Sequence, residues 1–148
     1  MQVYLDKMLV LVCTKFNGKF DKGGKPYFLH CLKVMQLVNS DDDELNSIAV
    51  GHDLVEDTDV SFIDLFAEGF SDRIVNGIRA LTKQKGESKE EYLAKILENK
   101  DACKVKLADL THNSDIRRLK GITEKDIERM KKYQAMYITI KQHLESIE

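Results

Sequence analysis

The chain has 148 residues, of which 43% are apolar and 32% charged, and its formal net charge is −2. This length and apolar content suffice for one hydrophobic core, so we expect a single domain over residues 1–148. The nearly balanced charge excludes both the basic bias of a general nucleic-acid-binding protein and the acidic bias of a disordered tail.

The cysteines and the N-terminal apolar run indicate the cellular compartment of the protein. Cys13, Cys31 and Cys103 are odd in number and widely separated, which fits reduced thiols in a cytosolic protein. The apolar run at residues 8–13 is far too short to span a membrane, and no small-residue cleavage site follows it. We therefore expect a cytoplasmic protein that binds neither membranes nor nucleic acid.

Apolar residues recur at helical spacing along most of the chain. A first helix is predicted over residues 1–16, ended by Asn17-Gly18, and a glycine-rich loop at 18–26 leads to a second helix at 27–38. The acidic run 41–43 can cap a third helix over about 44–56.

The starts of the later helices are predicted from residues typical of N-caps, which are Ser61, Ser71, Ser88, Asp101 and Thr123. The corresponding segments are 62–68, 72–81, 89–98, a helix from 101 through 108, and a long last helix from 123. No segment alternates like an exposed strand with a hairpin partner. The sequence therefore predicts an all-α helical bundle.

The third predicted helix carries the most informative cluster, His52-Asp53 followed by Glu56-Asp57. Residues four apart share a helix face, so His52 stacks under Glu56 and Asp53 under Asp57. Like charges at that spacing repel, and the helix dipole disfavours acids near the C-terminus. A divalent cation offsets both costs, because carboxylates and neutral imidazole ligate Mn, Fe and Zn. A solvated acidic helix end is the alternative, but the surrounding apolar residues favour the metal site.

Two further polar residues occupy positions where an all-α core would be apolar. His30 lies near the start of the second helix among large apolar side chains, and Asp109 enters the core side of a later helix. A histidine on such a face is more often a hydrogen-bonded core residue than a ligand, and a buried carboxylate is satisfied by a Lys or Arg as readily as by a cation. Taken singly, neither residue predicts a function.

Together these residues resemble the H…HD…D metal set of the HD-domain phosphohydrolases. The segments GKPYFLH (24–30), HDLVEDT (52–58), GIRALTK (77–83) and KLADLTHN (106–113) are similar, in order, to the four motifs of the hydrolase domain of RelA/SpoT enzymes. Those enzymes degrade the alarmones ppGpp and pppGpp of the stringent response. The resemblance implies a single HD-type helical domain, similar to the stand-alone metazoan SpoT homologues.

The resemblance also implies a role for each motif residue. Four residues would hold one Mn²⁺, with Fe, Co or Zn as alternatives: His30, His52, Asp53 and Asp109. Glu56 and Asp57 would orient and deprotonate the attacking water. Lys83 would reach a phosphate, and Asn113 would bind substrate beside the metal. His112 is not a ligand in the family motif, so we expect it in packing or outside the ligand shell.

Two positions depart from the family pattern. Lys19 stands where family members carry an arginine that can stack on guanine, and Leu110 replaces an arginine near the metal. Lys19 remains a predicted substrate-binding residue. The leading hypothesis is hydrolysis of the 3′-diphosphate of ppGpp or pppGpp, giving GDP or GTP plus pyrophosphate. The alternative is an HD-type phosphohydrolase acting on another nucleotide, such as NADPH or a deoxynucleotide monophosphate; the complete acidic motif argues against a catalytically silent nucleotide-binding module.

Two clusters outside the motifs have more than one interpretation. The tyrosines and methionines at 130–137 are predicted to lie in the core or on the surface of a homodimer rather than to form a base-stacking platform. The basic cluster Arg117, Arg118 and Lys120 either binds phosphate or forms the basic end of a helix.

Overall fold

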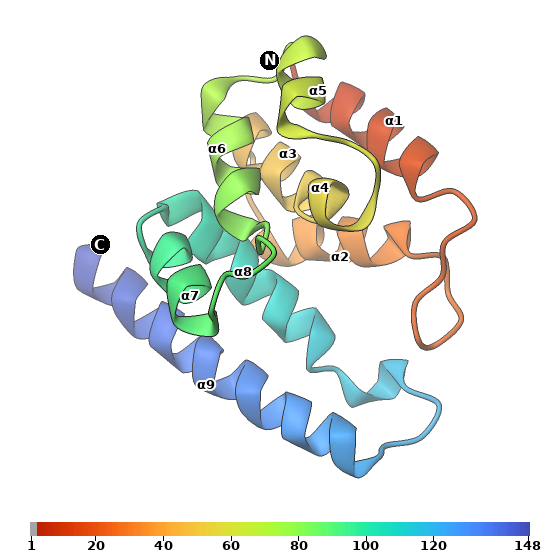
Figure 1. Ribbon diagram of the computed structural model, residues 1–148, viewed down its shortest axis with the longest axis vertical. Coiled ribbons are helices and arrows are strands. Elements are labelled where there is room, and N and C mark those ends of the chain that lie inside the picture. The colour runs from red at the N-terminus through yellow and green to blue at the C-terminus, as the bar shows by residue number, and fades with distance from the viewer. Residues whose placement is uncertain (1–2) are drawn as a thin grey trace.

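Helices joined by short turns make up the protein, seen in a computed structural model that describes residues 3–148 (Figure 1). The helices are, in chain order, α1 (Leu5–Lys15), α2 (Phe28–Val38), α3 (Asp43–Gly51), α4 (Leu54–Asp57), α5 (Phe62–Ala67), α6 (Asp72–Leu81), α7 (Lys89–Leu97), α8 (Lys100–Asn113), the 3₁₀ helix η1 (Ile116–Arg118) and α9 (Glu124–Ile147). Between residues 3 and 148 the only strand-like pairing is one bridge, Phe20 to Pro26. The all-α prediction is confirmed.

The helix starts follow the predicted caps with one exception. Ser61, Ser88 and Thr123 form capping boxes, and the Ser71 and Asp42 side chains accept hydrogen bonds from the first turns of α6 and α3. The exception is α8. Its cap is Asn99, which accepts from the Ala102 N–H at 2.9 Å, so the prediction that Asp101 caps this helix is wrong. Residues 1–2 of the first predicted helix lie outside the described residues.

The third predicted helix is interrupted where its functional residues lie. Helix α3 ends at Gly51 and α4 begins at Leu54, so His52 and Asp53 occupy a turn and not the continuous helix that was predicted. The physical reason is local competition for a carbonyl group. The Ala49 carbonyl, which an unbroken helix would offer to the Asp53 N–H, accepts from the His52 imidazole at 2.7 Å. The Asp57 N–H still donates to the Asp53 carbonyl at 2.9 Å, so the two acids remain one turn apart.

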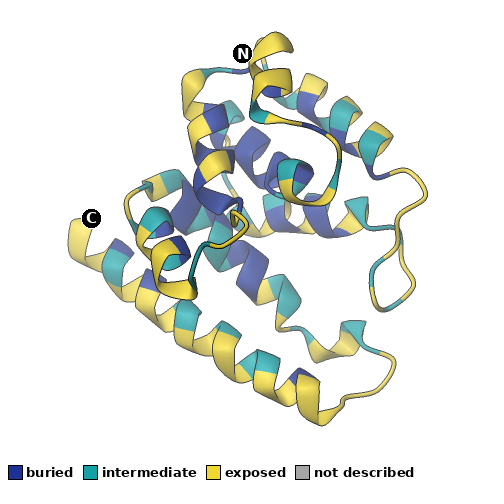
Figure 2. Ribbon diagram, viewed as in Figure 1, coloured by how far each residue is buried: buried dark blue, intermediate teal, exposed yellow. Residues whose placement is uncertain are grey.

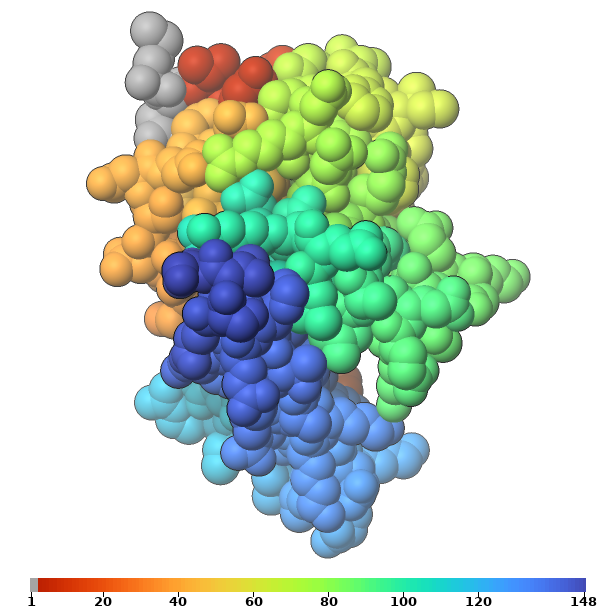
Figure 3. All heavy atoms as spheres, turned by 90° about the vertical axis from the view of Figure 1, so that its left-hand side faces the viewer, coloured from red at the N-terminus to blue at the C-terminus, as the bar shows by residue number. Residues whose placement is uncertain are grey.

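The core is centred on α3, whose residues from Leu45 to Gly51 are all buried (Figure 2). Helices α1, α2, α6 and α8 pack around it, and α2 and α8 also pack against each other. Because α2, the α3–α4 turn and α8 carry the predicted metal ligands, their mutual packing determines the geometry of the site. Helix α9 lies along α8 on one face of the molecule (Figure 3). No helix among residues 3–148 is both long enough and apolar enough to cross a membrane.

Arg73 on α6 connects the starts of the two helices that lead to the site. Its guanidinium donates to both carboxylate oxygens of Asp101, in the first turn of α8, at 2.8 and 2.9 Å. It also donates to Asp42, the cap of α3, at 2.8 and 3.2 Å. A planar, two-sided donor suits this paired carboxylate geometry, so α6 fixes the relative positions of α3 and α8.

Close packing between α6 and α3 makes Gly77 a sensitive position. A Cβ built at Gly77 would lie 2.5 Å from Ile48 Cδ1 and 2.9 Å from Ile48 Cγ1, and Ile48 is fully buried. We expect Gly77→Ala to destabilise the protein by about 1–2 kcal/mol, because overpacking of ~1–3 kcal/mol exceeds the ~1 kcal/mol by which alanine favours a helix. Thermal unfolding measures this, with the exposed neighbour Asn76→Ala as the control. A Gly77→Ala protein as stable as the control would contradict the packing argument.

Candidate active site

Two histidines and two aspartates from separate helices meet in the core. His30 comes from α2, His52 and Asp53 from the α3–α4 turn, and Asp109 from α8. One ligand atom from each residue lies within 4.8 Å of all the others. His30, His52 and Asp109 are buried, and Asp53 is half-buried. The structure thus brings together the four residues that the sequence predicted as metal ligands.

The orientation of His52 leaves one buried nitrogen facing the carboxylates. Its Nδ1 contacts the Ala49 carbonyl, which only accepts hydrogen bonds, so the proton of the neutral ring lies on Nδ1. Its Nε2 makes no well-aligned hydrogen bond, although Asp53 Oδ2 lies 3.0 Å away and Asp109 Oδ1 3.3 Å away. A buried nitrogen with a free lone pair and no donor nearby is an unsatisfied group.

Several donors surround the two aspartates. The Tyr27 hydroxyl donates to Asp53 Oδ2 at 2.7 Å. Lys106 donates to Asp109 Oδ2 at 3.0 Å, and the Asn113 amide donates to Asp109 Oδ1 at 3.0 Å. Burial alone would raise the pKa of Asp109, but the charge of Lys106 and the contacts with the histidines hold it well below its ordinary value. Both carboxylates are therefore ionised at neutral pH, consistent with the lowered pKa of Asp53.

These features fit a divalent cation. Two imidazoles and two carboxylates are the ligand types typical of Mn, Fe, Co and Zn sites. The free Nε2 of His52 lies where a ligand atom is needed, and the Nδ1 of the same ring is fixed by a main-chain carbonyl, as is usual for metal-bound histidine. The cluster is a candidate metal-binding site.

Glu56 and Asp57 lie beside this cluster on α4, and both are exposed. One carboxylate oxygen from each lies within 4.8 Å of the other and of an Asp53 oxygen. Burial, followed by the charges of Asp53 and Glu56, raises the pKa of Asp57 to about 6. Glu56 accepts from the Lys83 main-chain N–H at 2.9 Å. An acid pair with one member titrating near neutrality is suited to proton transfer.

The predicted substrate-binding residues lie at different distances from the metal ligands. Asn113 contacts Asp109 directly, as described above. Lys19 is exposed, and its ammonium donates to the Asp57 main-chain carbonyl at 2.6 Å, 5.8 Å from the centre of the Phe16 ring. The Lys83 side chain is exposed, and only its main chain contacts the acid pair. Leu110, which replaces a family arginine, is buried in the core.

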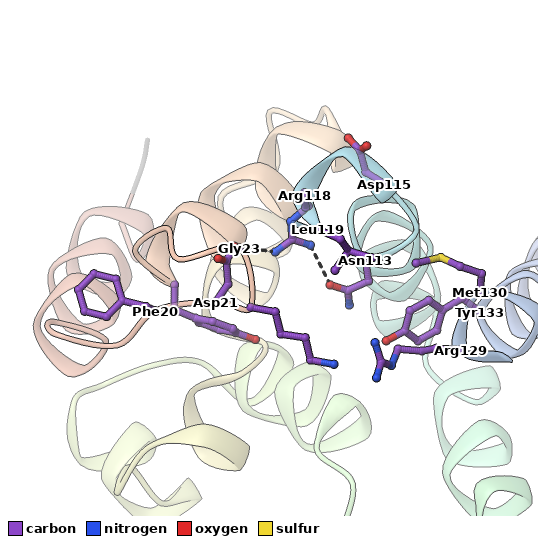
Figure 4. A pocket seen from close by; sticks show the side chains of 12 residues that line it. Phe20, Asp21, Gly23, Asn113, Asp115, Arg118, Leu119, Arg129, Met130 and Tyr133 are labelled. Atoms are coloured by element: carbon purple, nitrogen blue, oxygen red, sulfur yellow. Dashed lines mark hydrogen bonds and ion pairs between the residues drawn. The ribbon is translucent and has the colours of Figure 1, made fainter. Parts of the chain in front are cut away.

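A cleft of about 270 Å³ opens next to the metal ligands (Figure 4). Tyr27 and Asn113, which contact the metal ligands, lie on its wall. Arg118 stands on one side, hydrogen-bonded to Asn113 Oδ1 at 3.1 Å and paired with Asp21 at 3.3 Å. Arg129 and Tyr133 from α9 also line the cleft (Figure 4). The cleft therefore places aromatic groups, three cationic side chains and the carboxylates of Asp21 and Asp115 next to the candidate metal site, and Arg129 is paired with Asp126 at 3.0 Å.

Sequence reasoning missed several residues of this site. Tyr27 and Lys106 lie inside the quoted motifs, but nothing local shows that their polar ends contact Asp53 and Asp109. Tyr133, Met136 and Tyr137 pack against the core, as predicted for the stripe at 130–137, and Met130 and Tyr133 in addition line the cleft. One feature of the sequence pointed to the cleft, because the charged Arg129 directly precedes Met130 in α9.

Comparisons with known proteins identify the fold. No family model matches the chain. A protein of Oryza sativa subsp. japonica named "Putative GTP diphosphokinase RSH1, chloroplastic" is 29% identical over 130 residues, which cover 74% of this chain but only 15% of the rice protein. A solved structure of a metazoan ortholog of SpoT, described as hydrolysing ppGpp and playing a role in starvation responses, superimposes with a TM-score of 0.75 at 23% identity, covering 97% of this chain and 92% of that one. The chain therefore has the helical HD-domain fold of that SpoT ortholog.

Cation binding should release protons near neutral pH. Burial lowers the pKa of His52, but the charge of Asp53 and the contacts with Asp109 outweigh it, so this pKa lies well above 6.5. A proton held on the metal-free imidazole in this way must leave before Nε2 can bind a cation. Calorimetric titration of metal-free protein with Mn²⁺, in buffers of different ionisation enthalpy, counts the protons released. His143→Gln, which alters a distant histidine on α9, is the control. A binding heat that does not depend on the buffer would contradict the expectation.

Proposed function

We propose that the protein is a metal-dependent hydrolase of the RelA/SpoT type that removes the 3′-diphosphate of ppGpp and pppGpp. The products are GDP or GTP and pyrophosphate. The observation that carries the proposal is the convergence of the four candidate ligands with the acid pair Glu56 and Asp57 beside a cationic cleft. The fold shared with a SpoT ortholog described as a ppGpp hydrolase supports it, as does the sequence likeness to the rice protein.

The metal ligands are proposed to be His30, His52, Asp53 and Asp109, with Mn²⁺ as the expected ion. These four side chains would hold the ion, and a catalytic metal must in addition keep positions open to water and substrate. When bound, such a cation neutralises charge on the phosphoryl group and makes water more acidic. The donors Tyr27, Lys106 and Asn113 hold the two aspartates in place from outside.

Glu56 and Asp57 are proposed to act on the attacking water. In the reaction, the water oxygen attacks the phosphorus bonded to the ribose 3′-oxygen, that P–O bond breaks, and the 3′-oxygen gains a proton. Asp57, whose pKa is about 6, is suited to accept the water's proton. Glu56 is held by the Lys83 N–H and would orient the same water. A base next to the metal ligands can act without long-range proton transfer.

The cleft is proposed to hold the rest of the nucleotide. Arg118 and Arg129 face it from η1 and α9, and Lys22 joins them from the loop before α2. These cations suit the 5′-phosphates of a guanosine alarmone, whose charge would otherwise repel the carboxylates. Tyr133 offers an aromatic face on the same wall. Arginines from other elements thus supply the positive charge that the family has at position 110, while Lys19 keeps the charge at its own position.

One observation favours a different nucleotide as the second candidate. The Lys19 ammonium contacts the Asp57 carbonyl and is not a planar group that could stack on guanine. If guanine is not selected by stacking, the same chemistry could act on another 3′-phosphorylated nucleotide, an NADPH-like dinucleotide, or a deoxynucleotide monophosphate. Lys19 would then stabilise the α4 turn or contact phosphate.

A homodimer also stays a prediction.

The acid pair should separate chemistry from metal binding. We expect Glu56→Gln and Asp57→Asn to retain bound metal and to lose roughly 100-fold or more in kcat, the size expected for a positioned general acid–base group. Elemental analysis gives the metal content, and steady-state kinetics gives the rate. Glu68→Gln, which alters an exposed acid directly after α5, should change neither value. Loss of metal in parallel with loss of activity would instead make the pair ligands.

Product analysis distinguishes the two candidate substrates. We expect purified protein with Mn²⁺ to release pyrophosphate from ppGpp, and to release it faster than it releases phosphate from NADPH or a deoxynucleotide monophosphate. Ion-exchange chromatography identifies both products, and Asp109→Asn is the inactive control because it removes a proposed ligand. Faster phosphate release from another nucleotide would overturn the alarmone assignment, and full activity after exhaustive chelation would overturn the metal assignment.

A further inference from the structure

His112 contacts a metal ligand although the motif gives it no role. Its Nδ1 lies 2.7 Å from His30 Nδ1, on the side of the His30 ring opposite the aspartates. His30 Nε2 faces the cluster, 3.0 Å from Asp109 Oδ1. His30 is therefore held between a carboxylate on one nitrogen and a second imidazole on the other.

The geometry of the two rings is that of an in-plane hydrogen bond. The ring planes are inclined by only 11°, and the ring centres are 5.0 Å apart. With the two Nδ1 atoms 2.7 Å apart, the rings meet edge to edge, each nitrogen pointing at the other. The lone pair of one Nδ1 thus points at the proton of the other, so exactly one of these two nitrogens must carry a proton when both rings are neutral.

The two histidines of the cluster have different partners on Nδ1. His52 faces a carbonyl, which can only accept, so its proton position is fixed by the main chain. His30 faces an imidazole, which can donate or accept, so its proton position depends on His112. For His30 Nε2 to offer a lone pair, His30 Nδ1 must carry the proton and His112 Nδ1 must accept it.

We propose that His112 is a positioning residue that accepts the Nδ1 proton of His30 and so fixes His30 as an Nε2 metal ligand. This inference rests on the metal site of the proposed function and is independent of the substrate. A neutral His112 ring protonated on Nε2 directs the lone pair of its Nδ1 at His30 Nδ1, 2.7 Å away. The His112 carbonyl also accepts from Arg118 at 3.1 Å, which holds the last turn of α8 in place.

Two variants separate hydrogen bonding from packing. His112→Asn keeps an acceptor near the position of Nδ1, whereas His112→Phe keeps a planar ring and loses the acceptor. Partners of this kind typically change metal affinity by about 10- to 100-fold. We expect His112→Phe to lose affinity for Zn²⁺ and Mn²⁺ by that amount and His112→Asn to stay close to wild type, measured by competition with a chelating dye. Thermal unfolding of the metal-free proteins shows whether either variant is destabilised.

A direct measurement on the wild-type protein does not depend on how the variants fold. In Zn²⁺-loaded protein with ¹⁵N-labelled histidine, NMR should show His30 protonated on Nδ1 and His112 protonated on Nε2. A proton on His112 Nδ1, or equal affinity in the Phe variant and wild type, would overturn the role of His112 alone. Equal losses in the Asn and Phe variants would do the same, because packing would explain them. Failure of the wild type to bind either ion would overturn the proposed metal site as well.

Discussion

Two ionised carboxylates and two imidazoles share one interior site, and this constraint shapes the surrounding structure. Asp53 and Asp109 would repel each other in a medium of low dielectric constant unless positive charge lay between or beside them. Lys106, buried against Asp109, supplies one charge from the protein, and Tyr27 and Asn113 add neutral donors. Tyr27 and Asn113 donate to Asp53 Oδ2 and Asp109 Oδ1, the oxygens that also face the histidines. One ligand atom from each of the four residues lies within 4.8 Å of the others, and His52 Nε2 makes no aligned hydrogen bond, which distinguishes the cluster from an ordinary buried ion-pair network.

The fold holds these groups in place through helix packing rather than through loops. Asp109 lies within α8, and His30 within α2, so each is fixed by a helix that packs against the other. The α3–α4 turn is the irregular part. The site itself causes this irregularity, because the His52 ring donates a hydrogen bond to the Ala49 main-chain carbonyl. Farther away, Arg73 ties the starts of α3 and α8 to α6. Rigid support of this kind is what a precise ligand geometry requires.

The sequence predicts the helices from local signals, and it predicts the ligand set through short motifs that resemble those of a known family. Ser61, Ser88 and Thr123 mark helix starts through side-chain oxygens that bond the next turn, whatever the tertiary structure. The break at His52 was not predictable, since it depends on a side chain that is buried by α2 and α8. The contacts of Tyr27 and His112 were not predictable either, because each residue lies far along the chain from its partner, by 26 and 82 positions. Lys106 is only three positions from Asp109, but its contact depends on the burial of that face of α8.

The site thus has two parts with different physical requirements. The buried part tolerates little change, because removing any donor leaves an unpaired charge in the core, and this explains why short motifs suffice to identify it. The cleft is built from exposed and half-buried residues of the loop before α2, of η1 and of α9, which can be exchanged at small cost to stability. Under the proposed function, substrate choice would therefore be set by residues that carry little of the fold's stability. Lys19 is exposed and fits this division, whereas Leu110 is buried in the core and stands outside it.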